Sequence, residues 1–379
     1  MIYPNPSRFL IAAFLTMLAS VPLLQTAIEV QRGERPQALE FFTRPPTPAN
    51  LRANEHALEA ADVTARALRP WLQAGEFFSL REAGEKAIIG RDGWLFYQPG
   101  VAFLTQRAKP GDSTSAEALT AILDFRDQLA ARGIQLVILP VPNKESVYPD
   151  KLSGLAPPPA RVIGSDTRDF LAQCEQAGLD VVDLFAIYQK ARKQSATELY
   201  LAQDSHWSPA GMKLAAETVA DRILAHSELA RGSVKFDLEP VSIQRHGDLV
   251  QMLHSRAINS HLTPEPITVE QIVCRADAAP YTNAPASTVL VLGDSFLRIY
   301  EQDEPGHAGF IAHLARALGR PLTSIVNDGG AATLVRQELF RRPQLLAGKK
   351  FVVWEFAERD LRLGNEGWQR VPVPPQSKP

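Results

Sequence analysis

Cysteine is scarce in this 379-residue chain, and its charges nearly balance. The two cysteines, Cys174 and Cys274, are too few for a disulfide framework and lack the close spacing that zinc sites use. Forty lysines and arginines stand against 42 aspartates and glutamates, which gives a formal charge of −2. No global electrostatic field therefore attracts nucleic acid or an anionic membrane, and nucleic-acid binding is excluded. We expect no metal and no cofactor.

The two cysteines leave their redox state open. In an oxidising compartment they could pair, and closing a loop of about 100 residues would stabilise the fold by roughly 4.7 kcal/mol in the chain-entropy model. Both lie in apolar patterns, however, where a buried free thiol is equally comfortable. We therefore favour free thiols over a disulfide.

A long uncharged apolar run stands at the N-terminus. It reads FLIAAFLTMLASVPLL at residues 9–24, and residues 25–28 extend it to about 20 residues, near the lower limit for a bilayer span. No A-x-A-like cleavage site follows, which favours an uncleaved signal anchor over a cleaved secretory signal. A buried core helix is disfavoured, because the run is apolar all round and stands at the extreme N-terminus. The flanking charges do not decide its orientation, so we assign residues 1–30 as a signal anchor or transmembrane segment and infer export.

The rest of the chain divides into three parts, with no internal repeat or low-complexity tract. Residues 31–84 form a proline-rich linker and an N-terminal helical region. Residues 85–370 alternate between helical and strand patterns, and residues 371–379, VPVPPQSKP, form a tail. Catalysis is expected only in the middle part.

The pattern over residues 85–370 is that of an α/β fold. Residues 116–133 carry apolar side chains at helical spacing and end on Gly133, which suits a left-handed C-terminal cap. The strand at 134–142 follows at once and is apolar throughout, as in a parallel strand buried on both faces. Four further strands are predicted, at 179–185, 286–293, 321–329 and 349–361. Together they predict a doubly wound parallel sheet with helices on both faces, with residues 232–285 as a more extended insertion.

A serine stands at a strand-to-helix turn in G-D-S-F, residues 293–296. Ligands of open parallel sheets bind beyond the carboxyl ends of the strands, and this turn directly follows such a strand. A serine there is exposed at the sheet edge, near N–H groups of the next helix that can accept developing negative charge. Ser295 is therefore a candidate nucleophile, although G-D-S alone favours an ordinary helix N-cap.

A serine hydroxyl needs a base, and the base needs an acid that orients it. Among the eight histidines, His206 has an acid two residues away in a loop between predicted elements, while His246, His254 and His261 lie in the segment predicted as an irregular insertion, where a role stays open. In the extended stretch Q-D-S-H-W, Asp204 and His206 occupy alternate positions, so they can approach one another while Ser205 turns away. The competing explanation is a helix start, since Ser208 and Pro209 form an ordinary cap and first turn.

Five segments resemble, in this order, the AlgJ/AlgX family of alginate O-acetyltransferases. They are GRDGWLF at 90–96, VPNKESVYP at 141–149, D-x-H-W from Asp204, GDSF at 293–296 and WEFAERDL at 354–361. The resemblance covers the chain from about residue 85 onward and implies an SGNH-hydrolase-like domain. It also implies Ser295 as nucleophile, His206 as general base and Asp204 as the residue that orients the base.

The order of these residues resembles the acetyltransferase branch of that fold. His206 precedes Ser295 by 89 residues, whereas in ordinary SGNH hydrolases the serine comes first. Triads are defined by geometry and roles, so the reversed order does not exclude one. Since no carbohydrate-binding module follows the last segment, the chain resembles AlgJ more than AlgX.

Seven further residues are candidate parts of the site. The N-D-G-G sequence follows a strand at the same sheet edge, so oxyanion donors are expected from Asn327, Gly329 and Gly330, with a plain glycine-rich turn as the alternative. Four side chains are candidates for substrate binding: Lys144, Trp207, Arg298 and Arg359. The lysine could bind a uronate carboxylate or orient a loop, and the arginines could form structural ion pairs. The tryptophan could stack on a sugar or serve as a buried anchor.

The resemblance implies acetyl transfer through a seryl ester onto hydroxyls of an exported polysaccharide, alginate-like or another. It also implies a membrane-bound O-acyltransferase that relays the acetyl donor, with this chain on the periplasmic side of the inner membrane. The residues alone do not separate a transferase from a periplasmic carbohydrate esterase, since a triad prepares only the acyl-enzyme. A non-catalytic polysaccharide-binding assembly subunit is the alternative from another class.

Overall fold

The computed structural model describes residues 6–40, 43, 45, 47–107, 114–155, 162–226, 229–253, 255–363 and 367–374. The chain forms two compact units. We call Met1–Glu82 with His254–Ser260 the N-terminal unit, and Ala83–Leu253 with His261–Pro379 the α/β unit.

Helices make up the described part of the N-terminal unit. They are α1 (Pro6–Gln31), α2 (Gln37–Glu40), α3 (Pro48–Ala61), α4 (Val63–Gly75), the π-helix η1 (Glu76–Leu80) and most of α13 (Arg256–His261). The side chain of Thr47 caps α3 by accepting a hydrogen bond from the N–H of Asn50. The apolar run lies in α1, where Leu10–Gln31 is long and apolar enough to cross a membrane. Gln25 and Glu29, towards the end of this stretch, are buried, while its large apolar side chains such as Leu15 and Leu24 are exposed.

The five predicted strands form one parallel sheet in the α/β unit. Its order is β4-β3-β9-β7-β8, from β3 (Gln135–Val141), β4 (Asp180–Val181), β7 (Val289–Gly293), β8 (Thr323–Val326) and β9 (Phe351–Ala357). Strands β7 and β9 are buried along their whole length, as strands covered on both faces must be. The carboxyl ends of the strands therefore meet at one edge of the sheet, where polar side chains can gather.

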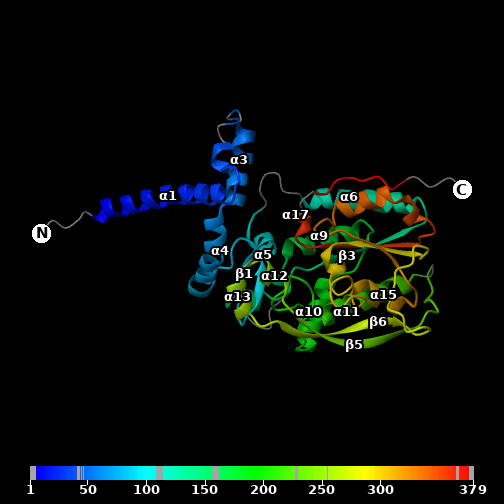
Figure 1. Cartoon of the computed structure of the whole chain (residues 1–379). Helices are drawn as coiled ribbons and strands as arrows, with labels where there is room; N and C mark the ends of the chain where they lie inside the picture. The colour runs from blue at the N-terminus through cyan, green and yellow to red at the C-terminus, as the bar shows by residue number, and fades with distance from the viewer. Residues whose placement is uncertain are drawn as a thin grey trace. The chain divides into compact units, whose positions relative to one another are not determined.

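Helices cover both faces of the sheet, so the predicted doubly wound α/β fold is confirmed. Figure 1 shows α6 (Ser115–Ala130) on one side of β3, and α11 (Pro209–Leu224) and α15 (Phe310–Leu318) on the other. Aromatic contacts from β9 reach both layers. The ring of Trp354 meets Phe125 of α6 at 5.3 Å between centroids, and Phe351 meets His226, just after α11, at 5.6 Å.

Shorter elements complete the α/β unit. The further helices are α5 (Gln98–Thr105), α7 (Lys144–Val147), α8 (Pro149–Leu152), α9 (Ser165–Gln176), α10 (Leu184–Gln194), α12 (Asp248–Gln251), α14 (Ser295–Arg298), α16 (Leu334–Arg341), η2 (Pro343–Leu346) and α17 (Asp360–Leu363). A small antiparallel pair joins β1 (Ala87–Ile89) to β2 (Leu95–Tyr97). Its turn carries Asp92 and Gly93 at positive φ, as the sequence D-G favours.

The segment predicted as an irregular insertion contains a regular ribbon. Strands β5 (Phe236–Arg245) and β6 (Glu265–Cys274) pair antiparallel over ten positions. They run along the outer side of α11 and α15 (Figure 1), where Lys213 of α11 pairs with Glu270 at 2.5 Å. Cys174 is buried, Cys274 is half-buried, and both thiols are free, as favoured from the sequence.

The first residues of the predicted C-terminal tail lie against α6. Val371 and Val373 are buried, and the N–H of Val373 donates to Oε1 of Gln128 at 2.6 Å. Residues 367–374 therefore pack with the α/β unit, while residues 375–379 lie outside the described part of the chain.

Candidate active site

The turn after β7 presents a serine at the carboxyl edge of the sheet. Asp294 caps α14 by accepting from the N–H of Phe296 at 2.9 Å, and its own N–H donates to Oε2 of Glu355 at 2.9 Å. A Cβ at Gly293 would lie 2.3 Å from that same Oε2, so only glycine fits this position. Ser295 follows as the first helical residue and is half-buried.

Ser295, His206 and Asp204 form one continuous hydrogen-bonded line. Nε2 of His206 lies 2.8 Å from Oγ of Ser295, and Nδ1 lies 2.7 Å from Oδ1 of Asp204. The imidazole and the carboxylate are buried. A loop before α11 presents the pair, and Ser208 ends this loop by capping α11 through the N–H of Gly211. The structure thus brings together the three side chains that the sequence singled out.

Asp204 is held by donors on both of its oxygens. Oδ1 accepts from the N–H of His206 at 3.0 Å, while Oδ2 accepts from Nε of Arg245 at 3.0 Å and from the N–H of Asp248 at 3.2 Å. Burial alone would raise the pKa of Asp204, but the charge and hydrogen bond of His206, helped by Arg245, hold this pKa well below its usual range. The carboxylate is therefore ionised and fixed in place.

The same neighbours make His206 more basic. Burial by itself lowers the pKa of the imidazole, but the carboxylates of Asp204 and Asp248 outweigh burial and raise the pKa above its ordinary value of 6.5. With its Nδ1–H directed at Asp204, Nε2 faces the serine hydroxyl as a proton acceptor. This arrangement suits general-base chemistry.

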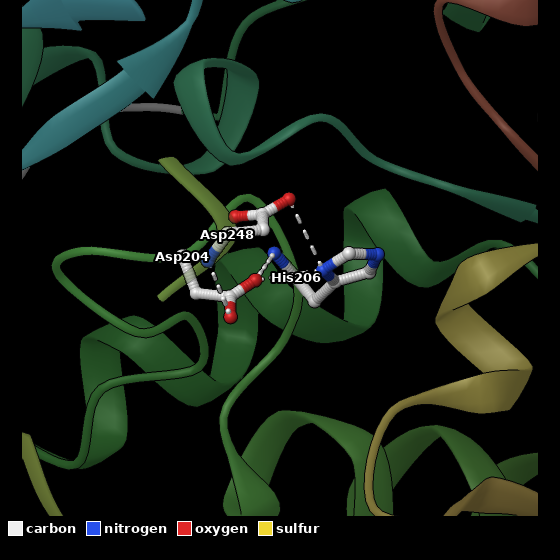
Figure 2. Close-up of side chains that lie close together, drawn as sticks. All are labelled: Asp204, His206 and Asp248. Carbon is white, nitrogen blue, oxygen red and sulfur yellow. Dashed lines mark hydrogen bonds and ion pairs between the residues drawn. The ribbon is translucent and has the colours of Figure 1, made fainter. Parts of the chain in front are cut away.

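A second carboxylate, Asp248, lies beside the imidazole (Figure 2). Its Oδ2 is 3.7 Å from Nδ1 of His206 and accepts from Oγ of Ser205 at 2.5 Å, and its Oδ1 accepts from the N–H of Ser205 at 2.7 Å. Burial and the neighbouring Asp204 raise the pKa of Asp248 to about 6. Asp248 thus clamps the loop that carries the Asp204–His206 pair.

Sequence reasoning missed Arg245 and Asp248, which lie in the segment predicted as an irregular insertion. The signal nearest to them is Gly247. A Cβ there would lie 2.0 Å from the carbonyl oxygen of Gln203, so the two backbones meet at a distance that only glycine allows.

Asp204, His206 and Asp248 also have the spacing of a small metal site. Their ligand atoms all lie within 4.8 Å of one another. Both oxygens of Asp204 already accept from N–H donors, however, and the Arg245 guanidinium places a positive charge at the same carboxylate. These contacts favour a hydrogen-bonded acid–imidazole pair over a cation site.

The candidate oxyanion residues do not all keep a free donor. The N–H of Asn327 donates to the carbonyl oxygen of Gly293 at 2.9 Å, which places Asn327 beside the nucleophile turn. The N–H of Gly330 donates to the carbonyl oxygen of Asn327 at 3.0 Å, so the turn itself uses it and the expectation for Gly330 is corrected. Gly329 is exposed and adopts a φ of +67°. The side-chain amide of Asn327 donates to Oε2 of Glu338 at 3.4 Å and has a second N–H, so Gly329 and Asn327 are left as candidates.

Lys144 and Trp207 are buried, which corrects their proposed contact with substrate. The ammonium of Lys144 donates to the carbonyl oxygens of Leu95, Ala202 and Asp204 at 2.5, 2.8 and 3.0 Å. The lysine therefore orients the loop, which was the alternative expectation. The indole of Trp207 is fully covered and packs on Phe296 and Phe310, with ring centroids 5.1 and 5.6 Å apart. It is a core anchor.

The two candidate arginines lie near the nucleophile turn. Arg298, on α14 itself, pairs with Asp303 and, at 2.9 Å, with Asp328. The guanidinium of Arg359 lies 6.0 Å from the ring of Phe296, the residue after the serine. Burial alone would lower the pKa of Arg359, but Asp360 and Asp294 outweigh burial and raise it. Arg298 thus forms the structural ion pairs that were its alternative role.

Comparisons with known proteins place this geometry in context. The family model described as the SGNH hydrolase-like domain of acetyltransferase AlgX matches residues 87–358. A probable alginate O-acetylase AlgJ of Pseudomonas putida is 28% identical over 308 residues, which cover 77% of this chain and 74% of that protein. The solved O-acetyltransferase domain of P. putida AlgJ has a TM-score of 0.56 at 27% identity, over 73% of this chain and 92% of that one.

The similarity to AlgX itself is shorter. The alginate biosynthesis protein AlgX of Pseudomonas aeruginosa is 29% identical over 143 residues, which cover 36% of this chain and 27% of that protein. The chain is therefore more similar to AlgJ than to AlgX, as the sequence motifs indicated.

Proposed function

This chain belongs to the AlgX family of SGNH hydrolase-like acetyltransferase domains, and from this we propose that it transfers acetyl groups onto hydroxyls of an exported polysaccharide. The observation that carries the proposal is the line of contacts from Asp204 through His206 to Ser295, at 2.7 and 2.8 Å. An alginate-like polymer is the substrate that the names of the relatives favour. The proposed acetyltransferase domain spans residues 85–370.

The reaction has two half-reactions with Ser295 as the nucleophile. In the first, Nε2 of His206 takes the hydroxyl proton while Oγ attacks the acetyl carbonyl, and the donor's leaving group departs with that proton. In the second, a sugar hydroxyl gives its proton to His206 and attacks the ester, and Oγ of Ser295 leaves and is reprotonated. Asp204 stays ionised throughout and holds the Nδ1–H tautomer.

The negative charge that develops on the acetyl oxygen needs donors. We assign this role to the side-chain amide of Asn327, which donates one of its two N–H groups to Oε2 of Glu338 at 3.4 Å and has a second one to offer. The N–H of Gly329 is a second candidate, and the N–H of Gly330 is already used. Of the four candidates for substrate binding, Arg359 is the one that remains, and its guanidinium lies 6.0 Å from the ring of Phe296.

Helix α1 supports a proposal about where in the cell the chain is located. We propose that this helix anchors the chain in the inner membrane and places the α/β unit in the periplasm. The acetyl donor would come from a membrane-bound O-acyltransferase that relays acetyl groups across that membrane. An activated acetyl group is the only substrate besides the polymer that the two half-reactions require.

Covalent capture tests the proposal directly. The full chain is incubated with p-nitrophenyl acetate and its intact mass is measured; the wild type should gain one acetyl group, because the activated ester supplies a good leaving group. Ser295→Ala should gain none, while the control Ser205→Ala should gain it, since Ser205 donates to Asp248 and does not contact Nε2 of His206.

Adding an alginate oligomer to the acetylated chain separates transferase from esterase. Acetylated oligomer is the expected product, whereas release of acetate alone would point to a carbohydrate esterase. An acetyl group that persists in Ser295→Ala would contradict the assignment of the nucleophile.

Asp248→Asn should shift the pH profile of acyl-enzyme formation to lower pH. The rate requires neutral His206, so it rises with pH through the pKa of that imidazole. The groups that influence this pKa are Asp204, Asp248 and Asp294, and removing the charge of Asp248 lowers it. Asparagine can still accept from the N–H of Ser205, so the loop keeps this hydrogen bond.

The measurement is the rate of p-nitrophenol release between about pH 5 and 9, with Asp237→Asn as the matched control. Asp237 lies on the neighbouring strand β5 and pairs with the exposed Arg275, so its removal should leave the midpoint unchanged. A midpoint for Asp248→Asn that stays in place or moves to higher pH would refute an electrostatic role for Asp248.

A further inference from the structure

We propose that α4 and η1 lie on the membrane surface and bury their apolar side chains in the lipid interface. This inference rests on the membrane anchor proposed for α1 and adds a second contact between the N-terminal unit and the bilayer. The occupant of the apolar surface would be phospholipid at the level of the headgroups and the first acyl carbons.

Large apolar side chains are exposed on these two helices. They are Leu68, Trp71, Leu72, Phe78 and Leu80, which we call the α4 surface. Leu68, Trp71 and Leu72 stand at positions i, i+3 and i+4 of α4 and so share one helix face. Trp71 is 72% exposed, whereas the four other tryptophans, all in the α/β unit, are buried. A group of apolar side chains of this size at the surface indicates an interaction site.

The end of α1 fixes the level at which α4 begins. Oε1 of Gln25 accepts from the N–H of Val63 at 2.9 Å, and Nε2 of Gln25 donates to the carbonyl oxygen of Ala61 at 2.9 Å. Gln25 directly follows the uncharged run of residues 9–24 in α1. The first residue of α4 is therefore hydrogen-bonded to the C-terminal third of the candidate span Leu10–Gln31, near the end of α1.

The direction of α4 places it along the bilayer. Figure 1 shows α4 running crosswise to α1 within the N-terminal unit. A helix that begins at the end of a spanning helix and runs crosswise to it lies parallel to the membrane surface. Its 13 residues extend for roughly 20 Å in this plane.

The composition of the α4 surface favours lipid over water. Tryptophan is enriched at the boundary between hydrocarbon and water, where its ring is apolar and its N–H can meet a polar group. The sequence of α4 contains two arginines and no acidic residue, a composition that anionic headgroups attract, and burial of the apolar side chains adds to this attraction.

Trp71 provides the probe for the test. The full chain is reconstituted into vesicles of phosphatidylethanolamine and phosphatidylglycerol, and flotation shows first whether α1 holds it there. Part of the lipid is then replaced by lipid brominated at the upper acyl carbons, which quenches nearby indoles. The signal of Trp71 is the difference in fluorescence between the wild type and Trp71→Phe. We expect brominated lipid to remove most of this difference.

Two variants sharpen the test. Leu72→Glu places a charge on the α4 surface at an exposed position, so it should reduce the quenching of Trp71 while the chain still floats. Leu155→Glu introduces the same charge at another exposed leucine, in the α/β unit, and should leave the quenching intact.

The outcomes separate this inference from the anchor on which it rests. A chain that floats, but whose Trp71 responds to aqueous iodide and not to brominated lipid, overturns the membrane contact alone. Shielding from both quenchers also overturns it and indicates a protein, such as a second copy of the chain, on the α4 surface. A chain that does not float defeats both the anchor and the surface contact.

Discussion

His206→Gln should lower the rate of acetyl transfer by about 10⁵–10⁶-fold, the loss expected when a serine nucleophile is deprived of its base. Nε2 of His206 is 2.8 Å from Oγ of Ser295, and the imidazole acts in both half-reactions of the proposed mechanism. Steady-state transfer from p-nitrophenyl acetate to an alginate oligomer measures the effect. Combining His206→Gln with Ser295→Ala should cost little more than either change alone, because the two residues act as one unit.

A second histidine with an acidic partner supplies the control for this experiment. His226 contacts Oδ2 of Asp180 through Nε2 at 2.7 Å and packs on Phe351, at the amino end of β9 and thus at the edge of the sheet opposite the serine. His226→Gln should therefore leave the transfer rate close to that of the wild type. Equal losses in the two variants would mean that His206 supports the fold and not the chemistry.

Asp204→Asn should lower the transfer rate by about 10⁴-fold, the typical cost of holding the imidazole in the wrong tautomer. The carboxylate accepts from Nδ1 of His206 at 2.7 Å, which directs Nε2 toward the serine as an acceptor. An asparagine amide can turn its NH₂ toward Nδ1 and so favour the tautomer with the proton on Nε2. Nε2 would then face the serine hydroxyl as a donor and could not take its proton.

Asp180→Asn is the matched control for Asp204→Asn, since it alters the other aspartate–histidine pair. Thermal unfolding of each variant checks that the fold survives, because Asp204 is fully buried and also accepts from Arg245 and Asp248. A folded Asp204→Asn variant that retains more than a tenth of the wild-type rate would contradict the orienting role.

The sheet was predictable because each strand carries its signal locally. A continuous apolar run such as residues 134–142, bounded by a glycine-capped helix, specifies a strand buried on both faces. The β5–β6 ribbon was not predicted. Pro240 argues against a strand in the sequence of β5, although it is paired in the folded ribbon, and the pairing links residues such as Phe236 and Cys274 that are far apart in sequence. Strand pairing of that kind depends on tertiary packing more than on local pattern.

The residues of the candidate site that lie in loops at the carboxyl edge of the sheet could be predicted from the sequence. Ser295 and the Asp204–His206 pair each lie in a loop with a recognisable flanking helix start, and the carboxyl edge of a parallel sheet is where such groups meet. Arg245 and Asp248 lie 41 and 44 residues from Asp204, in a segment with no regular pattern. These two residues contact Asp204 only in the folded chain, so no local sequence pattern reveals them.

Sequence reasoning did not predict correctly which candidate side chains are buried. Lys144 and Trp207 are residue types that often contact sugars, and both stand next to site residues in the sequence or the fold. Whether such a side chain faces solvent or core depends on which elements pack over it. Phe296 and Phe310 cover Trp207, and three carbonyl oxygens surround the ammonium of Lys144.

The enclosed ammonium has a consequence for an enzyme that handles activated acetyl groups. A free amine beside such a centre would compete with the sugar hydroxyl and become permanently amidated. Burial lowers the pKa of Lys144 to about 8, but this is still above neutral pH, so the amine stays mostly protonated there, and its three N–H bonds are directed at backbone oxygens. The fold thus keeps the amine beside Asp204 from consuming the group that it transfers.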